Sequence, residues 1–595
     1  MDFIKNIEIK EVIQRFWLAV FFSIVASICA FIWITRDSYS YSDSGVFNDY
    51  LLSNIELQRI IMVALVGFLG AINWKILVEN QFKQRLYSPI SLGLLLLCLG
   101  GYFYYLTLVE ITDGNVIIRF VGVVLFLHLT ISYLPFLFKS KLPAFWEYNR
   151  RLFSHFFTSA FFTLVIYLGI SLALLALEYL FGMDNNKGKI YGQLIILLAG
   201  IFHPIYFLSE FPKNIDQLQP ARLKKSFKIF VVYILIPISI LYLVILYAYG
   251  IKIGIEISLP QGWVGKLVLS FCIIGILSYL LNYMFPEQSK SKLSTYFKRY
   301  FFPFLLIPIL LLFIAIYVRI SDYGITEPRY IVAFLGAWLL FISLYIIISK
   351  TDNIKVIPLT LSAIVLITLF GPFNMFKVSL NNQFNILKTA LVENGMLVDG
   401  KLSKATDLNS AVQNEMVSKI KYLYYDHKLS MLLPYSSDSV DLSFIKEDSI
   451  TRKFSMVRKT CTALGIKESF NNYYGRNNYT YLKIATTEPI DISEYRLFGF
   501  FNQHQENSKN YKFSHIDGSL KFRLQYPPSI DQEIDLTTFI EGLLVDDEKV
   551  KTTEEMSYSF SQDSIAFKII FTNLGLETKD KGQKINNYAG YILIE

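Results

Sequence analysis

Charged residues are scarce in this chain of 595 residues. Asp, Glu, Lys and Arg together make up 17% of the sequence, whereas about a quarter is usual in soluble globular domains. The scarcity excludes an ordinary soluble protein, but it is not uniform. The apolar excess stops near Phe376, and Lys, Asp, Glu, Asn and Ser then recur to the end of the chain. We therefore expect an all-α transmembrane helical bundle over residues 1–376 and a water-soluble domain over residues 377–595.

Cysteine is rare as well, with four residues in the chain. Cys461 is alone in the polar part, so it has no partner there for an internal disulfide. The sequence has no CxxC motif and no Cys/His cluster, which argues against structural zinc. It also lacks a P-loop, HExxH, GxSxG or GxGxxG motif in strand–helix context. We therefore expect no metal and no cofactor, and we assign no catalytic residue.

Lysine and arginine outnumber the acidic residues and give a net charge of +8. A nucleic-acid partner would require the basic residues to gather on one polar face or helix. They lie instead mostly in short loops between apolar segments, where they set membrane topology. The composition therefore indicates the lipid bilayer, and not nucleic acid, as a partner.

Eleven long apolar stretches approach the roughly 20 residues that a helix needs to cross a bilayer. Helices are expected because backbone polar groups in lipid must be satisfied within the segment. The predicted spans are Phe16–Ile34, Ile60–Leu77, Ile90–Leu106, Ile117–Phe136, Phe153–Phe181, Tyr191–Leu208, Phe227–Tyr249, Val264–Met284, Phe301–Val318, Tyr330–Ile348 and Val356–Phe376.

The basic residues also predict the orientation of the chain. Lys5, Lys10 and Arg15 place the N-terminus in the cytoplasm, because positively charged flanks tend to stay on that side. With this start, every loop predicted inside carries at least two Lys or Arg residues, and the loops predicted outside carry fewer in total. An odd number of spans then places residues 377–595 on the outer side of the membrane.

Four stretches carry a family resemblance: Phe145–Arg151, Leu241–Tyr249, Leu259–Val264 and, most specifically, Arg319–Tyr330. Together they resemble an uncharacterised bacterial membrane family, domain of unknown function 4153. Asn394–Lys401 resembles the start of the extramembrane part in relatives from Gram-negative bacteria. The resemblance covers most of the chain and implies a bacterial inner membrane with a periplasmic C-terminal domain. It carries no assigned activity.

Histidines within the predicted spans are the first candidates for a site, because ionisable groups are costly in lipid. His128, His155 and His203 fall in the inner half of three consecutive segments and form a candidate intramembrane polar cluster. Imidazole titrates near neutral pH, so such a cluster could relay protons or bind a metal. The favoured alternative is that each histidine hydrogen-bonds to a neighbouring helix or reaches the headgroups.

Arg119 and Glu178 form a second candidate, a pair in the outer leaflet. They lie at similar depth on consecutive antiparallel segments, and pairing would lower the cost of both charges. We favour a structural ion pair over a pair that binds substrate.

The loop between the ninth and tenth spans is the third candidate. Tyr323 and the glycine after it give a turn signal. A compact polar knot is the favoured interpretation. The alternative is a site for an anionic headgroup or polymer, because arginine can bind carboxylate or phosphate bidentately. The candidate residues are Arg319, Asp322, Tyr323 and Arg329.

The polar domain begins with helical patterns and ends with strand patterns. Apolar residues follow one helix face from Leu408 to Leu423. Beyond residue 473 apolar and polar residues alternate as in half-buried strands, most clearly over 520–526. We expect an α+β fold with a mainly antiparallel sheet, either whole or divided into a helical subdomain, 377–470, and a β-rich subdomain, 471–595.

These observations favour a non-enzymatic scaffold or sensor of the cell envelope, whose external domain binds an envelope protein, glycan or lipid. The alternative is a transporter or a lipid- or polysaccharide-handling permease with a polar intramembrane site. Pro204, Pro237 and Pro308 would then interrupt helices that line the site. A membrane-embedded transferase is a third possibility. A water-filled cavity beside His128 and His203 would favour transport.

Overall fold

The computed structural model divides into two compact units, Met1–Gly465 and Ile466–Glu595, and each is described by itself. The residues that the structure describes are 9–36, 53–80, 87–111, 113–137, 141–182, 188–213, 215, 218–220, 223–256, 263–285, 291–349, 353–405, 408–425, 428–447, 453–466, 479–484, 490, 492–503, 511–516, 519–526, 530–543, 550–562, 565–579 and 582–595.

The first unit is a bundle of apolar helices, as the sequence predicts. Among the described residues, 10 helical segments are long and apolar enough to cross a membrane, or 11 if one bent helix pair is counted as a span. The single helices among them are α2 (Ile9–Arg36), α3 (Asn54–Asn80), α4 (Tyr87–Leu108), α5 (Gly114–Tyr133), α6 (Leu142–Phe181), α11 (Trp263–Asn282), α12 (Lys292–Tyr323) and α13 (Glu327–Ile348). Two spans are composite: α7 (Lys189–Leu197) continues through η3 (Leu198–Phe202) into α8 (His203–Ser209), and α9 (Lys225–Lys228) continues through η5 (Ile229–Leu235) into α10 (Ile236–Glu256).

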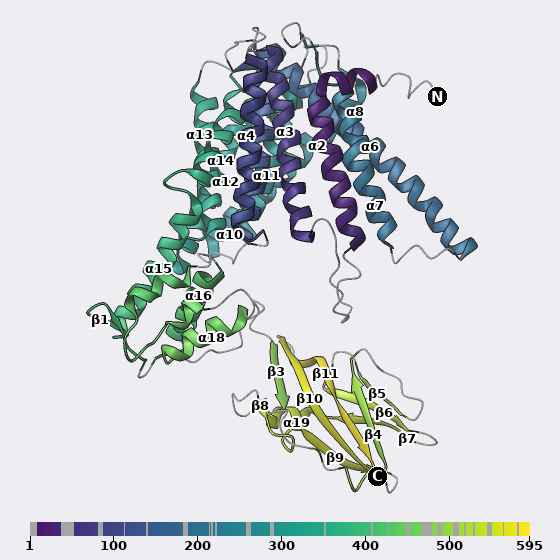
Figure 1. Cartoon of the computed structure of the whole chain (residues 1–595), viewed down its shortest axis with the longest axis vertical. Coiled ribbons are helices and arrows are strands. Elements are labelled where there is room, and N and C mark those ends of the chain that lie inside the picture. The colour runs from purple at the N-terminus through teal and green to yellow at the C-terminus, as the bar shows by residue number, and fades with distance from the viewer. Residues whose placement is uncertain are drawn as a thin grey trace. The chain divides into compact units, whose positions relative to one another are not determined.

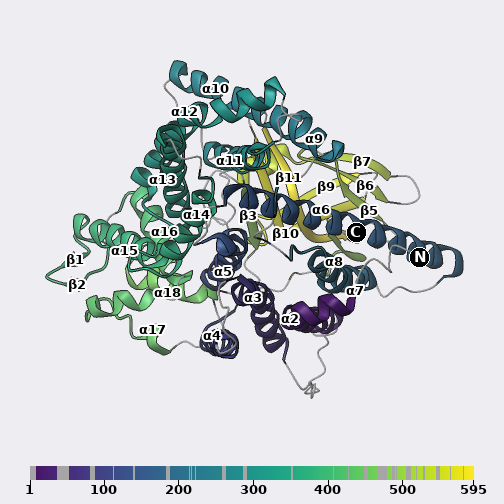
Figure 2. The same cartoon turned by 90° about the horizontal axis from the view of Figure 1, so that it is seen from above.

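One row of packed helices runs across this bundle. Figure 2, which looks along the helices, shows the order α12, α13, α14 (Val356–Phe370), α5, α3 and α2, and each neighbouring pair in this row is in contact. Close approach depends locally on glycine. A Cβ at Gly67 on α3 would come within 2.9 Å of the Phe22 ring on α2, so the absent side chain lets these two helices approach.

Each composite span contains a π-helical turn just before a proline. In the first, η3 precedes Pro204, which has no N–H to donate to the carbonyl four residues earlier. That carbonyl belongs to Gly200, and it accepts a hydrogen bond from the Ser23 hydroxyl on α2. The neighbouring helix thus satisfies the polar group that the proline frees, as lipid requires.

The same solution recurs in α12, where Pro308 lies inside the helix. The carbonyl four residues earlier belongs to Phe304, and it accepts a hydrogen bond of 2.9 Å from the Tyr247 hydroxyl on α10. Tyr247 lies in the stretch Leu241–Tyr249 that carries part of the family resemblance. A tyrosine there joins α10 to α12 where the proline leaves an acceptor.

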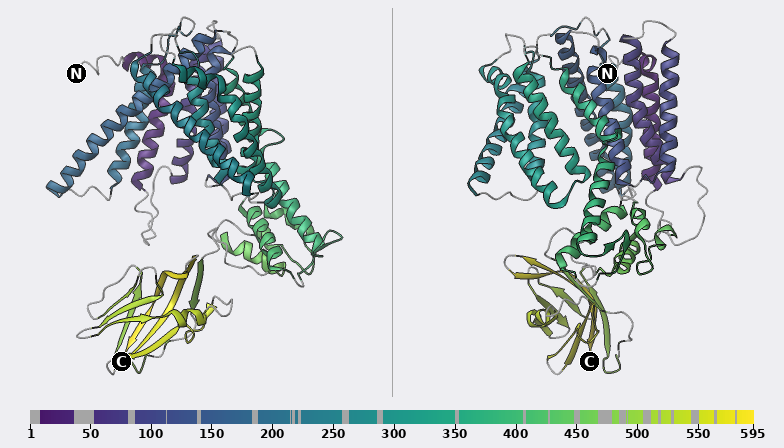
Figure 3. Two further views of the ribbon diagram at one scale, coloured as in Figure 1. Left: turned by 180° about the vertical axis from the view of Figure 1, so that it is seen from behind. Right: turned by 90° about the vertical axis from the view of Figure 1, so that its left-hand side faces the viewer.

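The longest helix, α6, is packed along only part of its length. It has 40 residues and is therefore about 60 Å long, twice the thickness of the bilayer core. Thr163 is its last buried residue, and no side chain from Leu164 to Phe181 is buried by the described chain. In Figures 1 and 3 this far half diverges from the other helices of its unit. Its apolar surface suits contact with lipid.

A small helical module, residues 375–463, follows α14. α14 and α15 (Met375–Glu393) form the bent pair, with an angle of 48° between them. The side chain of Asn374 caps α15 by accepting from the backbone N–H of Lys377 at 3.0 Å. After α15 the module contains the hairpin β1 (Leu397–Val398) and β2 (Lys401–Leu402), then α16 (Ser410–Tyr425), η7 (Leu429–Tyr435), α17 (Phe444–Glu447) and α18 (Lys453–Ala463). Asp399 and Gly400 form the turn between the two strands, and both have positive φ.

The described residues of the second unit form two sheets and a short helix. One sheet has the order β4-β11-β10-β3-β8, with β9 also paired to β10, and the other has the order β5-β6-β7. The elements are β3 (Tyr479–Ile484), β4 (Leu497–Asn502), β5 (Lys512–His515), β6 (Lys521–Tyr526), β7 (Ile530–Asp535), α19 (Thr537–Leu543), β8 (Val550–Lys551), β9 (Ser557–Gln562), β10 (Ile565–Lys579) and β11 (Gly582–Ile594).

Among the described residues of this unit, the strand pairs are antiparallel except for β3 with β8. The predicted α+β fold with a mainly antiparallel sheet is therefore confirmed. Aromatic side chains fill the core between the sheets, including Phe501, Phe513, Phe522 and Phe571. Phe513 and Phe522 stack with ring centroids 4.7 Å apart. This unit has a hydrophobic core of its own.

Candidate functional site

The loop between α12 and α13 is very short and depends on one glycine. Gly324 follows α12 with φ +77°, a conformation that L side chains rarely adopt. A Cβ there would collide with Ile386 and lie 2.7 Å from Asn382 Oδ1 on α15. The loop is therefore shaped to lie against the helical module.

α15 holds this loop through two neighbouring amides. Asn382 Oδ1 accepts a hydrogen bond of 2.7 Å from the backbone N–H of Ile325. Gln383 Nε2 donates to the carbonyls of Tyr323 and Ile325, at 3.1 and 2.9 Å. Gln383 is buried. These contacts satisfy backbone groups that so short a loop cannot satisfy within itself.

α16 holds the same loop from another side. The buried Lys419 donates through Nζ to the carbonyl of Tyr323 at 2.9 Å. The Tyr422 hydroxyl donates to Glu327 Oε1 at 2.5 Å, and Glu327 is buried at the start of α13. The pKa of Lys419 is lower than its ordinary value, mainly because the side chain is buried. The nearby Glu415 carboxylate raises this pKa, and Arg329 lowers it.

We call this set of contacts the α12–α13 clasp. It consists of Tyr323, Gly324, Ile325, Glu327, Arg329, Asn382, Gln383, Lys419 and Tyr422.

Of the four predicted loop residues, Tyr323 and Arg329 belong to the clasp, whereas Arg319 and Asp322 do not. Arg329 Nη1 donates to the carbonyl of Gly324 at 2.6 Å, and its guanidinium lies 5.4 Å from the centroid of the Tyr323 ring. Asp322 and Tyr323 have exposed side chains, and Arg319 is half-buried. Sequence reasoning did not identify Asn382, Gln383, Lys419 or Tyr422. Within single helices these residues carry no signal that names a distant loop as their partner.

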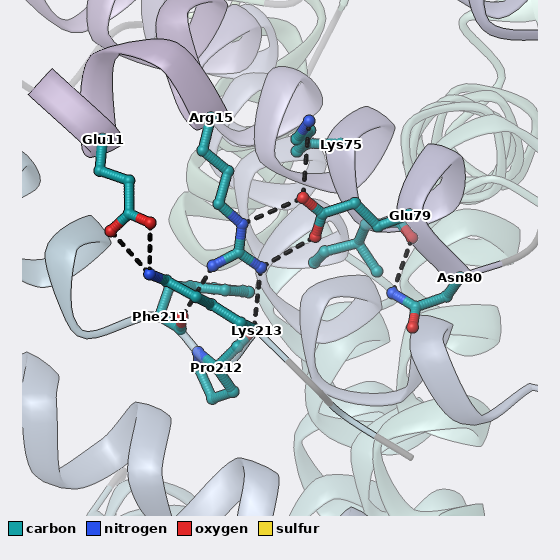
Figure 4. Close-up of polar contacts among 9 residues, drawn as sticks. Glu11, Arg15, Lys75, Glu79, Asn80, Phe211, Pro212 and Lys213 are labelled. Atoms are coloured by element: carbon teal, nitrogen blue, oxygen red, sulfur yellow. Dashed lines mark hydrogen bonds and ion pairs between the residues drawn. The ribbon is translucent and has the colours of Figure 1, made fainter. Parts of the chain in front are cut away.

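A second polar cluster joins the N-terminal part of α2 and the C-terminal end of α3 to the segment after α8, as Figure 4 shows. Arg15 makes two hydrogen bonds to the Glu79 carboxylate, at 3.0 and 2.8 Å. It also donates to the carbonyls of Phe211 and Pro212, at 2.8 and 2.9 Å. Lys75 approaches the same carboxylate at 3.5 Å. One guanidinium thus bridges three segments.

An outlying ion pair completes this group, which we call the Arg15 cluster. Lys213 Nζ lies 2.6 Å from Glu11 Oε2 (Figure 4), and both side chains are about half exposed. In the sequence, the basic residues here indicate only membrane topology. Their pairing with acids on other helices was missed. The cluster consists of Glu11, Arg15, Lys75, Glu79 and residues 211–213.

The first family stretch, Phe145–Arg151, forms a related contact at the start of α6. Arg150 and Arg151 both bind the fully buried carboxylate of Glu147, at distances of 2.7 and 2.8 Å. The Trp146 indole donates to the carbonyl of Leu280 on α11 at 2.8 Å. These side chains neutralise one buried charge and attach α6 to a neighbouring helix.

The three intramembrane histidines have different polar partners in the structure. His128 is exposed on α5, where Nδ1 lies 2.9 Å from the carbonyl of Val124. His203 Nδ1 lies 2.8 Å from the Ser159 hydroxyl on α6. His155 Nδ1 lies 3.9 Å from Glu210 Oε2. Among the described residues, no three His, Cys, Asp or Glu side chains are grouped to hold a metal.

Arg119 and Glu178, the predicted pair in the outer leaflet, do not form an ion pair with each other. Arg119 donates to the Tyr105 hydroxyl on α4 at 2.8 Å. Its guanidinium lies 4.3 Å from the centroid of the Phe376 ring on α15. Glu178 lies on the far half of α6 and is half-buried. Arg119 therefore joins α5 to α4 and α15, and aromatic groups take the place expected for the carboxylate.

Comparison with known proteins identifies a family but no activity. A family model described as a domain of unknown function (DUF4153) matches residues 20–380, more than half of the chain. An uncharacterized protein of Pasteurella multocida, PM1469, is 25% identical over 258 residues. This match covers 42% of the chain and 43% of the relative, so the chain spans less than half of that protein. No solved structure matches.

Proposed function

Because the chain belongs to the DUF4153 family, whose description names no activity, we propose a function from its own structure. The protein is a non-enzymatic scaffold or sensor of the bacterial cell envelope. Its extramembrane part binds an envelope component and passes the effect of binding to the membrane helices.

The α12–α13 clasp is the observation that carries this proposal. Side chains from α15 and α16 bind the loop between two membrane helices through backbone carbonyls, a backbone amide and a buried carboxylate. A flexibly tethered domain needs no such contacts, because a linker alone would hold it near the membrane. Buried polar contacts of this kind favour one fixed position of α15 and α16 relative to α12 and α13. Movement of α15 or α16 would therefore act on α12 and α13.

The proposed setting is the inner membrane, with the N-terminus in the cytoplasm and residues 377–595 forming the periplasmic domain. The distribution of Lys and Arg between the loops supports this orientation. A topology reporter fused after Glu595 should therefore be active outside the cytoplasm. Activity of such a reporter only in the cytosol would contradict the proposed orientation.

Photocrosslinking in living cells tests the binding role. A photoreactive residue at Phe498 on β4, which is 53% exposed, should trap an envelope protein or glycan. The matched control is Leu172 on the far half of α6, which is 65% exposed but expected to face lipid. The same adduct from both positions, or adducts with cytosolic proteins alone, would count against a specific external binding surface.

A transporter or lipid-handling permease is the second candidate function. The composite spans favour it, since π-helical turns and proline breaks recur in helices that line transport sites. His203 lies directly after η3 and contacts Ser159 on α6. His203→Gln should then abolish uptake or release while the amount of protein in the membrane is unchanged. Normal transport of envelope precursors in that variant would remove the support that His203 gives.

A further inference from the structure

One strand of the second unit has backbone groups that face away from its sheet. β9 pairs with β10 along one side. The backbone N–H of Phe571 donates to the carbonyl of Met556 at 2.9 Å, and in an antiparallel ladder every second pair from there exchanges hydrogen bonds. Positions 558, 560 and 562 therefore direct their N–H and C=O groups to β10. The backbone groups of positions 557, 559 and 561 face the other side.

The outward side of β9 is largely unpaired. The N–H of Ser557 donates to the carbonyl of Glu554 at 3.1 Å, in the turn that precedes the strand. For the backbone groups of Ser559 and Ser561, the described residues provide no hydrogen-bond partner. The side chains of both serines are exposed. An edge with unpaired N–H and C=O groups can accept a further strand.

Three other edge strands of this unit are protected, each in a different way. On β4, the Tyr511 hydroxyl donates to the carbonyl of Phe500 at 2.8 Å. On β5, the N–H of His515 donates to the Tyr588 hydroxyl at 3.3 Å. On β7, every second residue is acidic, namely Asp531, Glu533 and Asp535. β9 has no charged residue and no proline, so it lacks the side chains that commonly prevent edge strands from pairing.

The side chains of β9 indicate which kind of strand would match it. Tyr558 and Phe560 lie on one face, where both are half-buried and their ring centroids are 6.1 Å apart. Serines occupy the opposite face. A matching strand would therefore alternate apolar and small polar residues, so that its apolar side chains lie beside the two rings. β9 itself has this alternation, and because it is uncharged two copies would meet without electrostatic repulsion.

We propose that two copies of this chain pair through β9, as antiparallel strands related by a two-fold axis at Ser559. The two Ser559 residues then exchange both backbone hydrogen bonds, and Ser561 of each copy donates to the carbonyl of Ser557 of the other. Tyr558 of each copy lies opposite Phe560 of the other, which covers the exposed parts of the four rings. The larger sheets of the two copies become one continuous sheet. This inference does not depend on the proposed binding role.

Cysteine crosslinking in isolated membranes tests the contact between copies. The variant carries Ser559→Cys together with Cys98→Ser, because Cys98 is exposed whereas the other three cysteines are buried. The two Cα atoms at position 559 would lie about 5.5 Å apart, so a short bismaleimide reagent should join two chains into a product of twice the chain mass. Glu533→Cys on β7, in the same background, is the matched control and should give about tenfold less product or lower still. Equal yields from the two positions, no product of twice the chain mass, or a product with a different protein alone would overturn the proposal.

Analytical ultracentrifugation of the purified full chain in detergent tests whether this edge carries the association. The wild type should show a monomer–dimer equilibrium. Ser559→Pro removes an N–H that β10 does not use, so the sheet should be retained while the dissociation constant of the dimer rises about tenfold or more. Ser559→Lys places two like charges opposite each other and should have the same effect without a change of backbone.

Glu533→Pro is the matched control, because position 533 also directs its N–H away from the neighbouring strand. It should leave the dissociation constant unchanged. The thermal unfolding midpoint shows whether Ser559→Pro is folded, and Ser559→Lys decides alone if it is not. A wild type that stays monomeric, or a dimer whose dissociation constant the folded Ser559 variants do not change, would overturn the proposal.

Discussion

The α12–α13 clasp and the Arg15 cluster are the two most extensive polar contacts described in the first unit, and they are built differently. In the clasp, side chains from α15 and α16 bind backbone groups of the loop and of the last residue of α12, and the buried Lys419 has no carboxylate at ion-pair distance among the residues that the structure describes. In the Arg15 cluster, a guanidinium binds a carboxylate bidentately, and one exposed pair, Glu11 with Lys213, lies beside it. The clasp depends on shape and on single hydrogen bonds, whereas the cluster depends on paired charge.

This difference indicates different roles. Paired charges fix the ends of helices that apolar packing already places side by side, as with α2 and α3. Contacts to loop backbone have little value unless the loop and the module keep one relative position. The clasp is therefore the better candidate for a joint that transmits movement, and the predictions below test whether the two sites differ as this comparison requires.

Gly324→Ala should have the largest effect. A Cβ there combines an unfavourable backbone conformation, about 1–3 kcal/mol, with overpacking against Ile386 and Asn382, about 1–3 kcal/mol. Thermal unfolding of the full chain in detergent should show a lower midpoint. The control is Gly395→Ala, which has φ +68° but open space around the new Cβ. If both variants lose equal stability, contact between the loop and α15 contributes nothing measurable.

Arg15→Lys should rank second, with a loss of about 2 kcal/mol. Lysine keeps the charge but cannot reproduce the planar fork that binds Glu79 and two carbonyls at once. Arg523→Lys is the matched control, because its bidentate contact to Asp531 is about half exposed. The unfolding midpoints of the two variants give the comparison. Equal losses at the two positions would show that burial does not distinguish the Arg15 cluster from a surface pair.

The buried lysine of the clasp predicts a dependence on pH. Burial holds the pKa of Lys419 below its ordinary value of 10.5, so the folded state favours the neutral amine more than the unfolded state does. The resulting stabilisation is present above pH 10.5 and is lost as the pH falls through the folded pKa. The unfolding midpoint of the wild type, relative to Lys419→Met, should therefore rise from neutral pH toward pH 10.5. A difference that stays constant over this range would contradict the assigned burial.

The sequence predicted the membrane helices because the length of an apolar run, measured against bilayer thickness, is sufficient for that purpose. It could not predict the clasp to the same extent. The turn at Tyr323-Gly324 is visible in the sequence. The residues that bind it are distant in the chain, because Gln383 lies 60 positions and Lys419 lies 96 positions after Tyr323. Helical periodicity shows which face of a helix is buried and does not name the partner.

The histidines illustrate the same limit. Counting residues from the ends of the spans gives the depth of His128, His155 and His203, and all three fall in the inner half. Depth does not give the direction of a side chain around its helix, which depends on packing. His128 is exposed, whereas His203 faces α6. Depth alone therefore does not predict which group each histidine contacts.

Glu11→Gln should have the smallest effect of these changes. The carboxylate pairs with Lys213, but the two side chains are 47% and 55% exposed, and such pairs contribute about 0.5 kcal/mol or less. Added salt should remove that small difference because exposed charges are screened. Unfolding midpoints at low and high salt, for Glu11→Gln, Lys213→Gln and both together, would measure the pair. A coupling as large as the Arg15→Lys loss would mean that the cluster acts as one network and would contradict the small contribution expected for an exposed pair.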